Sequence, residues 1–212
     1  MRLLVIGASQ GIGLATCKAA LAAGMTVRAF SRGAEGMKLD DPNLEKMAGD
    51  ALNVEDLTAA LKDVDAVAHT LGVPLTYQTI VNGTDLFSSA TAALLPLMAE
   101  HGPKRLVVVT GFGAGRCVSG ISLLEKLPFR AVLGRIYDDK SKQEALVTDS
   151  GLDWTIIRPG VLTNGAARGK YKVLSEPNTW RNGMISRADV ADYVVRALQD
   201  PATIGTDPVT VN

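Results

Sequence analysis

Cysteine, histidine and aromatic residues are scarce in this chain of 212 residues. The two cysteines, Cys17 and Cys117, stand far apart, and neither belongs to a CxxC pair or lies beside a cluster of histidines. A disulfide framework and a metal site are therefore not expected. Aromatic residues make up 5% of the chain, so few rings are available to stack on a flat ligand.

The chain also lacks an excess of charge and a long hydrophobic run. Lysine and arginine total 22, as do aspartate and glutamate, so no net charge attracts nucleic acid or an anionic membrane. The apolar stretch in MRLLVIGAS is too short for a signal sequence with a cleavage site or for a membrane span. We therefore expect a cytoplasmic protein with neither nucleic acid nor a membrane as a partner.

What is present is a regular alternation of strand-like and helix-like segments. With 47% hydrophobic residues the chain can bury a full core, and its length suits a single domain over 1–212. Apolar, β-rich runs occur at 2–8, 26–32, 66–72, 105–111, 154–160 and 207–212. Apolar residues at helical spacing occur at 12–24, 54–64, 84–102 and 139–151. This order predicts an α/β fold, a doubly wound Rossmann-like parallel sheet with helices on both faces.

The alternation weakens in two segments, at about 112–135 and 163–184, which we predict to be substrate loops. In these loops and at 73–80, the candidate ligand contacts are three aromatic and three cationic residues: Tyr77, Tyr171, Trp180, Arg168, Lys170 and Lys172. The aromatic rings could stack on a flat acceptor or serve as lid contacts. The cations suit a carboxylate-bearing substrate or form an ordinary solvated surface.

A glycine-rich turn follows the first predicted strand. In VIGASQGIG, Gly7, Gly11 and Gly13 stand between an apolar run and the start of a helix. Without a Cβ atom at these positions, a pyrophosphate can approach the backbone amides and the positive end of the helix. The turn therefore predicts a dinucleotide site.

The choice between NAD and NADP depends on the end of the second strand, where NAD-binding proteins carry an acidic residue for the ribose. This chain has Ser31 and Arg32 there, and a hydroxyl with a guanidinium suits a phosphate. We therefore predict that NADP(H) is preferred over NAD(H). Asp50, after the third strand, either accepts a bond from the adenine amino group or caps the helix that begins near Val54.

These segments resemble the short-chain dehydrogenase/reductase superfamily, specifically the atypical branch that includes biliverdin IXβ reductase and flavin reductase-like proteins. The resemblance rests on GASQGIG, GDALNVEDLTAALKDVDAVAHTLG, SGLDWTIIRPGVL and ISRADVADYVV, and covers nearly the whole chain. It implies that Thr70 to Gly72 line the adenosine side and that Pro159 to Leu162 pass beside the nicotinamide. The full set of expected cofactor contacts is Gly7, Ala8, Ser9, Gln10, Gly11, Ile12, Gly13, Ser31, Arg32, Asp50, Ala51, Thr70, Leu71, Gly72, Thr110, Lys140, Pro159, Gly160, Val161 and Leu162.

The chain departs from the superfamily at its catalytic residues. Classical members have a tyrosine and a lysine four residues apart, so that the cation lowers the pKa of the phenol. Here Tyr137 and Lys140 are three apart, with two aspartates between them that could neutralise the lysine. The resemblance assigns Lys140 to the nicotinamide ribose, with Glu144 one helical turn later. Tyr137 is either a proton donor or a packing residue, and Thr110 is expected to position substrate or cofactor.

Three functions are compatible with these residues. The first is an NADP(H)-dependent reductase that passes hydride to a planar conjugated acceptor such as a flavin, quinone or tetrapyrrole. The proton for this reaction comes either from solvent or from Tyr137. The second is a non-catalytic NADP(H)-binding redox sensor that signals to a partner protein. The third is an enzyme similar to nucleotide-sugar epimerases, although the chain is short for their substrate lobe. The sequence leaves monomer and homodimer equally open.

Overall fold

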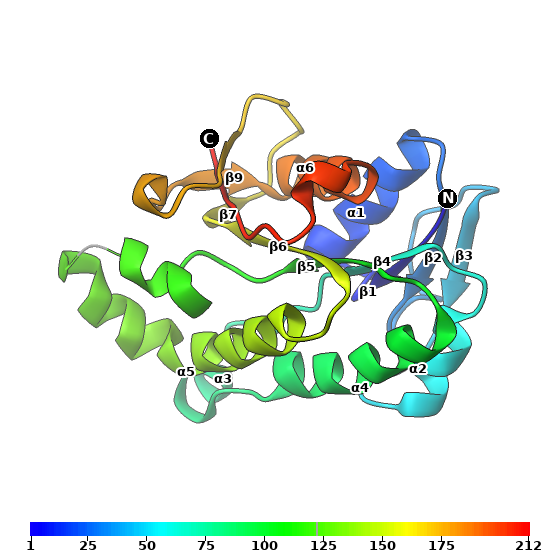
Figure 1. The fold of residues 1–212 in the computed structure, drawn as a ribbon, viewed down its shortest axis with the longest axis horizontal. Coiled ribbons are helices and arrows are strands. Elements are labelled where there is room, and N and C mark those ends of the chain that lie inside the picture. Colours follow the sequence, from blue (N-terminus) through cyan, green and yellow to red (C-terminus); the bar gives the residue numbers. More distant parts are fainter. Residues whose placement is uncertain (122) are drawn as a thin grey trace.

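The computed structural model describes residues 1–121 and 123–212, and a parallel sheet runs through the middle of the molecule (Figure 1). The strands are β1 (Arg2–Ile6), β2 (Thr26–Phe30), β3 (Leu44–Met47), β4 (Ala66–His69), β5 (Arg105–Val109), β6 (Asp153–Pro159), β8 (Lys172–Leu174) and β10 (Val209–Val211). In this part of the chain their order is β3-β2-β1-β4-β5-β6-β10-β8, with only β8 antiparallel to its neighbour. The predicted doubly wound α/β fold is confirmed.

Helices cover both faces of this sheet (Figure 1). One face carries α1 (Gly11–Ala22) and α6 (Arg187–Gln199), which pack on each other, and the other carries α2 (Val54–Leu61), α4 (Leu86–His101) and α5 (Leu123–Thr148). The remaining elements are α3 (Tyr77–Asn82), the 3-10 turns η1 (Gly115–Gly120), η2 (Pro177–Thr179) and η3 (Pro201–Thr203), and the short parallel pair β7 (Val161–Thr163) and β9 (Met184–Ser186). Among the described residues, no helix combines the length and apolar character needed to cross a membrane.

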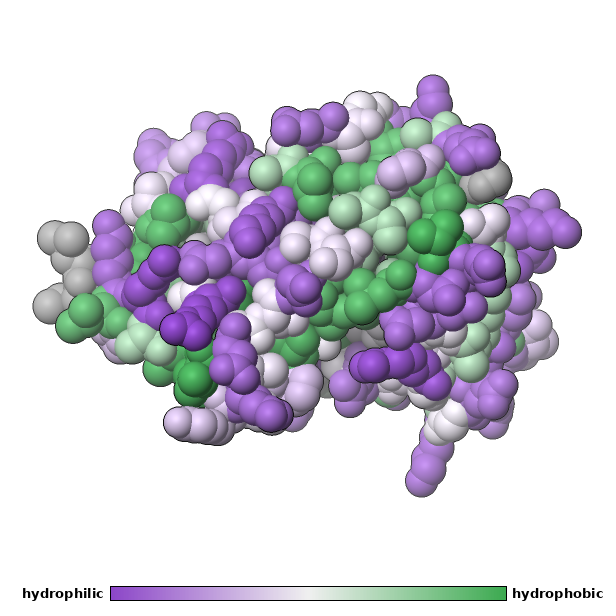
Figure 2. Space-filling model, turned by 90° about the horizontal axis from the view of Figure 1, so that it is seen from below, coloured by the Kyte–Doolittle hydropathy of each residue, from purple (hydrophilic) through white to green (hydrophobic). Residues whose placement is uncertain are grey.

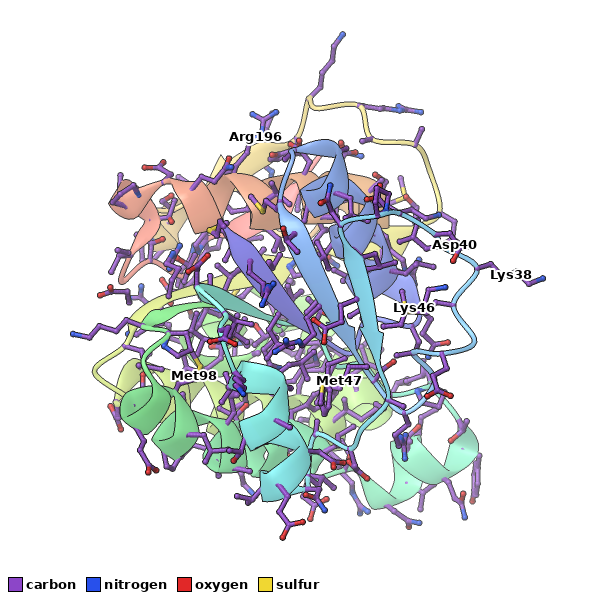
Figure 3. The ribbon with its side chains drawn as sticks, turned by 90° about the vertical axis from the view of Figure 1, so that its right-hand side faces the viewer. Lys38, Asp40, Lys46, Met47, Met98 and Arg196 are labelled. Carbon is purple, nitrogen blue, oxygen red and sulfur yellow. The ribbon has the colours of Figure 1, made fainter. Side chains whose placement is uncertain are left out.

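The central strands β1, β4 and β5 are almost entirely apolar because each buries both of its faces. In β1, Leu3 and Val5 pack in the cluster that includes α1 and α6, whereas Leu4 and Ile6 pack in the cluster that includes α2 and α4. Met47 of β3 and Met98 of α4 lie on one side of the sheet, opposite α6 (Figure 3). Sequential residues of a strand point to opposite faces, so a continuous apolar run is what a sheet between two helical layers requires.

The side chains outside the core are mixed in character. Seen from below Figure 1, on the side of α3, α4 and α5, the surface shows apolar patches interrupted by polar side chains (Figure 2). Exposed apolar residues of these helices include Tyr77, Leu127 and Val132. α4 and α5 therefore bury their sheet-facing sides and expose the others to solvent, whereas α3 has no buried residue and packs against α5.

The structure corrects the interpretation of 112–135 as a loop. η1 and the first half of α5 occupy this segment, while Ser122 lies outside the described residues. Pro128 and Gly134 lie inside α5, where packing against α3 and α4 offsets their poor helix propensity. The helix is therefore much longer than the segment 139–151 that apolar spacing indicates. The second segment, 163–184, is largely irregular apart from β8 and η2.

Candidate active site

A cavity of about 860 Å³ lies where β1 to β5 end at their carboxyl termini. Parallel α/β sheets bind their ligands at this edge. Of the residues expected at the cofactor or in catalysis, those that line the cavity are Gly7, Ser9, Gln10, Gly11, Ile12, Ser31, Arg32, Asp50, Ala51, Thr70, Leu71, Gly72, Thr110, Tyr137, Lys140 and Leu162. Residues from seven separate segments of the chain thus meet at one site.

Five expected contacts lie elsewhere. Ala8 is buried in the core beside α1, and Pro159 is buried in β6. Gly160 faces the backbone of Gly183, where an added Cβ would stand 2.1 Å from the carbonyl oxygen. Val161 is 56% exposed, and of the expected stretch 159–162 Leu162 is the residue that lines the cavity. The fifth is Gly13, which belongs to the glycine turn.

Gly13 and Gly11 in the glycine turn are required for different structural reasons. An added Cβ at Gly13 would stand 2.1 Å from the carbonyl oxygen of Gly7, so Gly13 is needed because the turn packs against its own backbone. Gly11 has a left-handed φ of 59°, and an added Cβ there would meet nothing within 4 Å. Gly11 is thus open to the cavity, and its backbone conformation favours glycine.

The start of α1 is left open for an anion. Gln10, at the N-cap position, makes no side-chain hydrogen bond to the first turn, and this turn carries no acidic residue. By contrast, Asn53 caps α2 and Ser186 caps α6 through their side chains. The first amide groups of a helix need partners, and those of α1 face a cavity in which phosphate oxygens could supply them.

The end of β2 provides the polar groups expected for a ribose phosphate. The hydroxyl of Ser31 is buried and has no hydrogen-bond partner among the described residues. Arg32 lies exposed at the cavity rim, outside every ion pair in the described part of the chain. The orphaned hydroxyl, the open start of α1 and the glycine turn together fit a dinucleotide.

Asp50 lies at the cavity but does not cap α2, which is one of the two roles considered for it. Its Oδ1 accepts a hydrogen bond from the backbone N–H of Leu52 at 3.0 Å, which closes a local turn. The cap is Asn53, whose Oδ1 accepts from the N–H of Asp56 at 3.0 Å. Asp50 thus remains a candidate contact for the adenine amino group.

Lys140 and Thr110 meet at the centre of the cavity wall. The Nζ of Lys140 donates to the carbonyl oxygen of Thr110 at 2.8 Å, and the Thr110 hydroxyl donates to Oε1 of Glu144 at 2.6 Å. Burial lowers the pKa of Lys140 to about 8, against the opposing effect of the negative charges of Glu144 and Asp139. The hydroxyl proton of Thr110 is thus bonded to Glu144, and the positioning role of Thr110 stays a prediction.

Glu144 belongs to a buried ionic chain that sequence analysis did not foresee. Its Oε2 pairs with Nη2 of Arg158 at 2.7 Å, and the same nitrogen lies 2.8 Å from Oδ2 of Asp207. Both side chains of the first pair are at most 4% exposed. Arg116 completes the chain by bonding to Asp207 through Nε at 2.6 Å. These residues hold the end of β5 against α5 and β6.

Tyr137 is packed into the wall of the cavity. An added Cβ at Gly111 would stand 2.5 Å from the Tyr137 hydroxyl, so Gly111 makes room for the phenol. The ring meets Phe129 edge to face, with centroids 4.8 Å apart. Burial raises the pKa of Tyr137 to about 12, with smaller contributions from Cys117 and Glu144. The geometry supports the packing role of Tyr137 over that of an activated acid.

The two aspartates between Tyr137 and Lys140 have other partners. Asp139 accepts hydrogen bonds from the backbone N–H groups of Phe87 and Ser88, and so caps α4. Asp138 pairs with Arg130 at 2.6 Å on the surface. Neither aspartate forms an ion pair with Lys140 among the described side chains, and of the two only the charge of Asp139 contributes to raising the pKa of Lys140.

The aromatic and cationic loop residues that were expected to contact the ligand lie outside the cavity. Trp180 is buried in a separate core cluster, Tyr171 bonds to Asp192, and Tyr77 is 82% exposed on α3. None of the six aromatic and cationic loop residues is among those that line the cavity. Other residues of the marked segments do line the cavity, namely Val73, Pro74, Leu75, Leu133 and Asn164. The rest of this wall is formed by Leu86, Phe87, Ile136 and Arg187. The only signal for Arg187 is its place in ISRADVADYVV.

A parallel sheet with an uncapped helix start, a glycine turn and a cavity at the carboxyl ends of its strands defines a Rossmann-like dinucleotide-binding protein. The chain belongs to the NAD(P)H-binding family, whose model matches residues 7–201. The resemblance to atypical short-chain dehydrogenases/reductases is thereby confirmed.

Several known proteins are similar to this chain. An uncharacterized chloroplastic protein of Arabidopsis thaliana is 28% identical over 93% of this chain and 71% of its own length. An uncharacterized sugar epimerase of Bacillus subtilis is 30% identical over 70% and 64% of the two chains, and sanguinarine reductase of Eschscholzia californica is 39% identical over 31% and 25%. The structure of ChuY, an anaerobilin reductase from Escherichia coli O157:H7, superposes with a TM-score of 0.81 at 25% identity, over 100% of this chain and 97% of ChuY.

Proposed function

We propose that the protein is an NADPH-dependent reductase that transfers hydride to a planar conjugated acceptor, such as a flavin, quinone or tetrapyrrole. The observation that carries this proposal is an apolar wall beside the dinucleotide residues. Phe87, Leu133 and Ile136 line the same cavity as Lys140 and Thr110. Apolar walls with a few convergent polar groups are typical of sites for flat organic ligands.

The proton chemistry of the site supports the same class of acceptor. Burial raises the pKa of Tyr137 to about 12, and the Thr110 hydroxyl donates to Glu144, so neither residue is an activated acid. The bound nicotinamide would supply the hydride, and the chain would position the acceptor and exclude water. A conjugated acceptor can take its proton from solvent. The names of two similar proteins, an anaerobilin reductase and sanguinarine reductase, point to the same activity.

Titration with NADPH and NADH, followed by an acceptor panel, tests this function. The purified chain is mixed with NADPH and a flavin, a quinone or a linear tetrapyrrole, and absorbance of the reduced nicotinamide is followed. Oxidation that depends on the acceptor is the expected result. Tight NADPH binding without oxidation of any acceptor would contradict the reductase and favour the redox sensor.

NADP(H) is the cofactor that we propose, and Arg32 provides a test. Arg32→Gln removes the guanidinium at the cavity rim, and we expect the Kd of NADPH to rise about tenfold because a charge-assisted phosphate contact is lost. The Kd of NADH should change less than twofold. Lys38→Gln is the control, since the exposed side chain of Lys38 extends into solvent (Figure 3) and does not line the cavity. An equal loss for NADPH and NADH would contradict the preference.

An epimerase is the second candidate, because the Bacillus subtilis relative carries that name. Removal of hydride from a sugar alcohol needs a base to take the hydroxyl proton. Tyr137 is the phenol at the cavity, and its pKa is raised by burial, which is the opposite of what such a base requires. The reductase is therefore the better supported of the two.

A further inference from the structure

We propose that Arg187, held by Asn164, forms a subsite for a carboxylate group of the acceptor. This proposal rests on the reductase function and narrows its substrate class to anionic acceptors. Arg187 is the first residue of α6 and lines the cavity together with Asn164 and Leu162. Its Nη1 donates to Oδ1 of Asn164 at 2.7 Å, which leaves the other guanidinium N–H groups for a ligand.

The backbone around this pair is fixed by Asp189. Oδ1 of Asp189 accepts hydrogen bonds from the backbone N–H groups of Arg168 and Gly169 at 2.7 and 2.9 Å. Its Oδ2 accepts from the hydroxyl of Ser186, the residue that caps α6, at 2.8 Å. These bonds lower the pKa of Asp189 despite its burial, so the carboxylate stays charged. The segment after Asn164 is thereby fastened to the helix that carries Arg187.

The guanidinium has no counter-ion in the described part of the chain. Arg187 takes part in none of its ion pairs, and Asn164 is a neutral partner. The described lining of the cavity includes three cations, Arg32, Lys140 and Arg187, against one carboxylate, Asp50. The chain has no net charge, but positive side chains outnumber negative ones in the described lining of the cavity. Bound anions would balance this local positive charge.

The position of Arg187 separates it from the ribose phosphate site. Arg32 follows β2, whereas Asn164 follows β7, which continues from β6. β2 and β6 are four strands apart in the sheet, roughly 19 Å at the usual spacing of strands. Arg187 therefore lies on the side of the cavity formed by the 163–184 segment. A fixed arginine fork is the group that binds carboxylates most specifically.

A linear tetrapyrrole with free propionate groups and its dimethyl ester form a matched pair of probes. They share one conjugated system and differ in charge. In Arg187→Gln, we expect the KM of the free acid to rise about tenfold or more, the KM of the ester to change less than twofold, and the Kd of NADPH to stay the same. Arg187→Lys keeps the charge and should recover most of the affinity for the acid. Arg168→Gln is the control, since its exposed side chain does not line the cavity.

Two outcomes would overturn the proposal. Equal loss for acid and ester would show that Arg187 only shapes the cavity. Weaker NADPH binding with both acceptors unaffected would show that the guanidinium serves a phosphate of the cofactor. If neither probe is reduced, the same comparison is made on the NADP-loaded protein by equilibrium binding. Preference for the acid that depends on Arg187 would then support the subsite although the reductase function had failed.

Discussion

Replacement of Lys140 by methionine is expected to lower kcat/KM for acceptor reduction about 100-fold, a loss of roughly 2.7 kcal/mol of transition-state stabilisation. The change removes a buried cation from the cavity wall and leaves the carbonyl oxygen of Thr110 without its donor. Steady-state kinetics with NADPH and the best acceptor measure the effect. Lys142→Met is the matched control, because Lys142 is exposed on the same helix. Retention of a third or more of the wild-type kcat/KM would contradict a role for Lys140 in the reaction.

The loss should not come from unfolding. Burial lowers the pKa of Lys140 from 10.5 to about 8, so between these values the unfolded chain binds more protons than the folded chain. The free energy of unfolding therefore rises as the pH rises from about 8 to 10.5. Below about pH 8 the buried cation lowers the free energy of unfolding by an amount that does not change with pH. At pH 7 removal of this cost should offset the loss of the bond to the Thr110 carbonyl, so the methionine variant should melt close to the wild type, which thermal unfolding measures.

The same pKa predicts a pH dependence. In the wild type, kcat/KM should fall as the pH rises through about 8, because Lys140 loses its charge. Lys140→Arg carries a guanidinium that stays protonated in this range, so its residual activity should show no such limb. A limb that persists in Lys140→Arg would assign the titration to another group.

Glu144→Gln is expected to lower the free energy of unfolding by about 3 kcal/mol. The substitution leaves the buried Arg158 with only Asp207 as a charged partner, and removal of one member of a buried ion pair typically costs about 3 to 5 kcal/mol. The melting temperature should fall by roughly 6 to 12 °C for a chain of this length. Thermal and urea unfolding measure both quantities.

Glu176→Gln is the control for this prediction, since Glu176 is exposed in the 163–184 segment. It should leave the melting temperature within a degree or two of the wild type. A loss below about 1 kcal/mol in Glu144→Gln would show that Asp207 alone satisfies Arg158 and that the chain from Thr110 to Arg116 is not a major source of stability.

The sequence by itself determined the order of the main strands and of the helices α1, α2, α4 and the second half of α5, and it placed the expected dinucleotide contacts at the ends of strands. Apolar runs and helical spacing are properties of neighbouring residues, so they report where each strand and helix lies. The parallel sheet then follows, and its carboxyl ends bring the glycine turn, Ser31, Arg32 and Thr70 to one cavity. The sequence did not predict the full length of α5, because Pro128 and Gly134 weaken its local pattern. The helix is stabilised by packing against α4, which the local pattern does not report.

Only the tertiary structure decided which side chains meet. Glu144 is 34 residues from Thr110, and Arg158 is 49 from the Asp207 oxygen that it binds, so no local pattern links them. The sequence leaves Tyr137 either as an acid or as a packing group. In the structure, its hydroxyl lies against Gly111, which favours the packing role. The sequence does not distinguish Arg187 from other charged residues. In the structure, its position at the start of α6 and its bond to Asn164 place it at the cavity. Periodicity is set by neighbours in the chain, whereas charge, pKa and ligand geometry are set by neighbours in space.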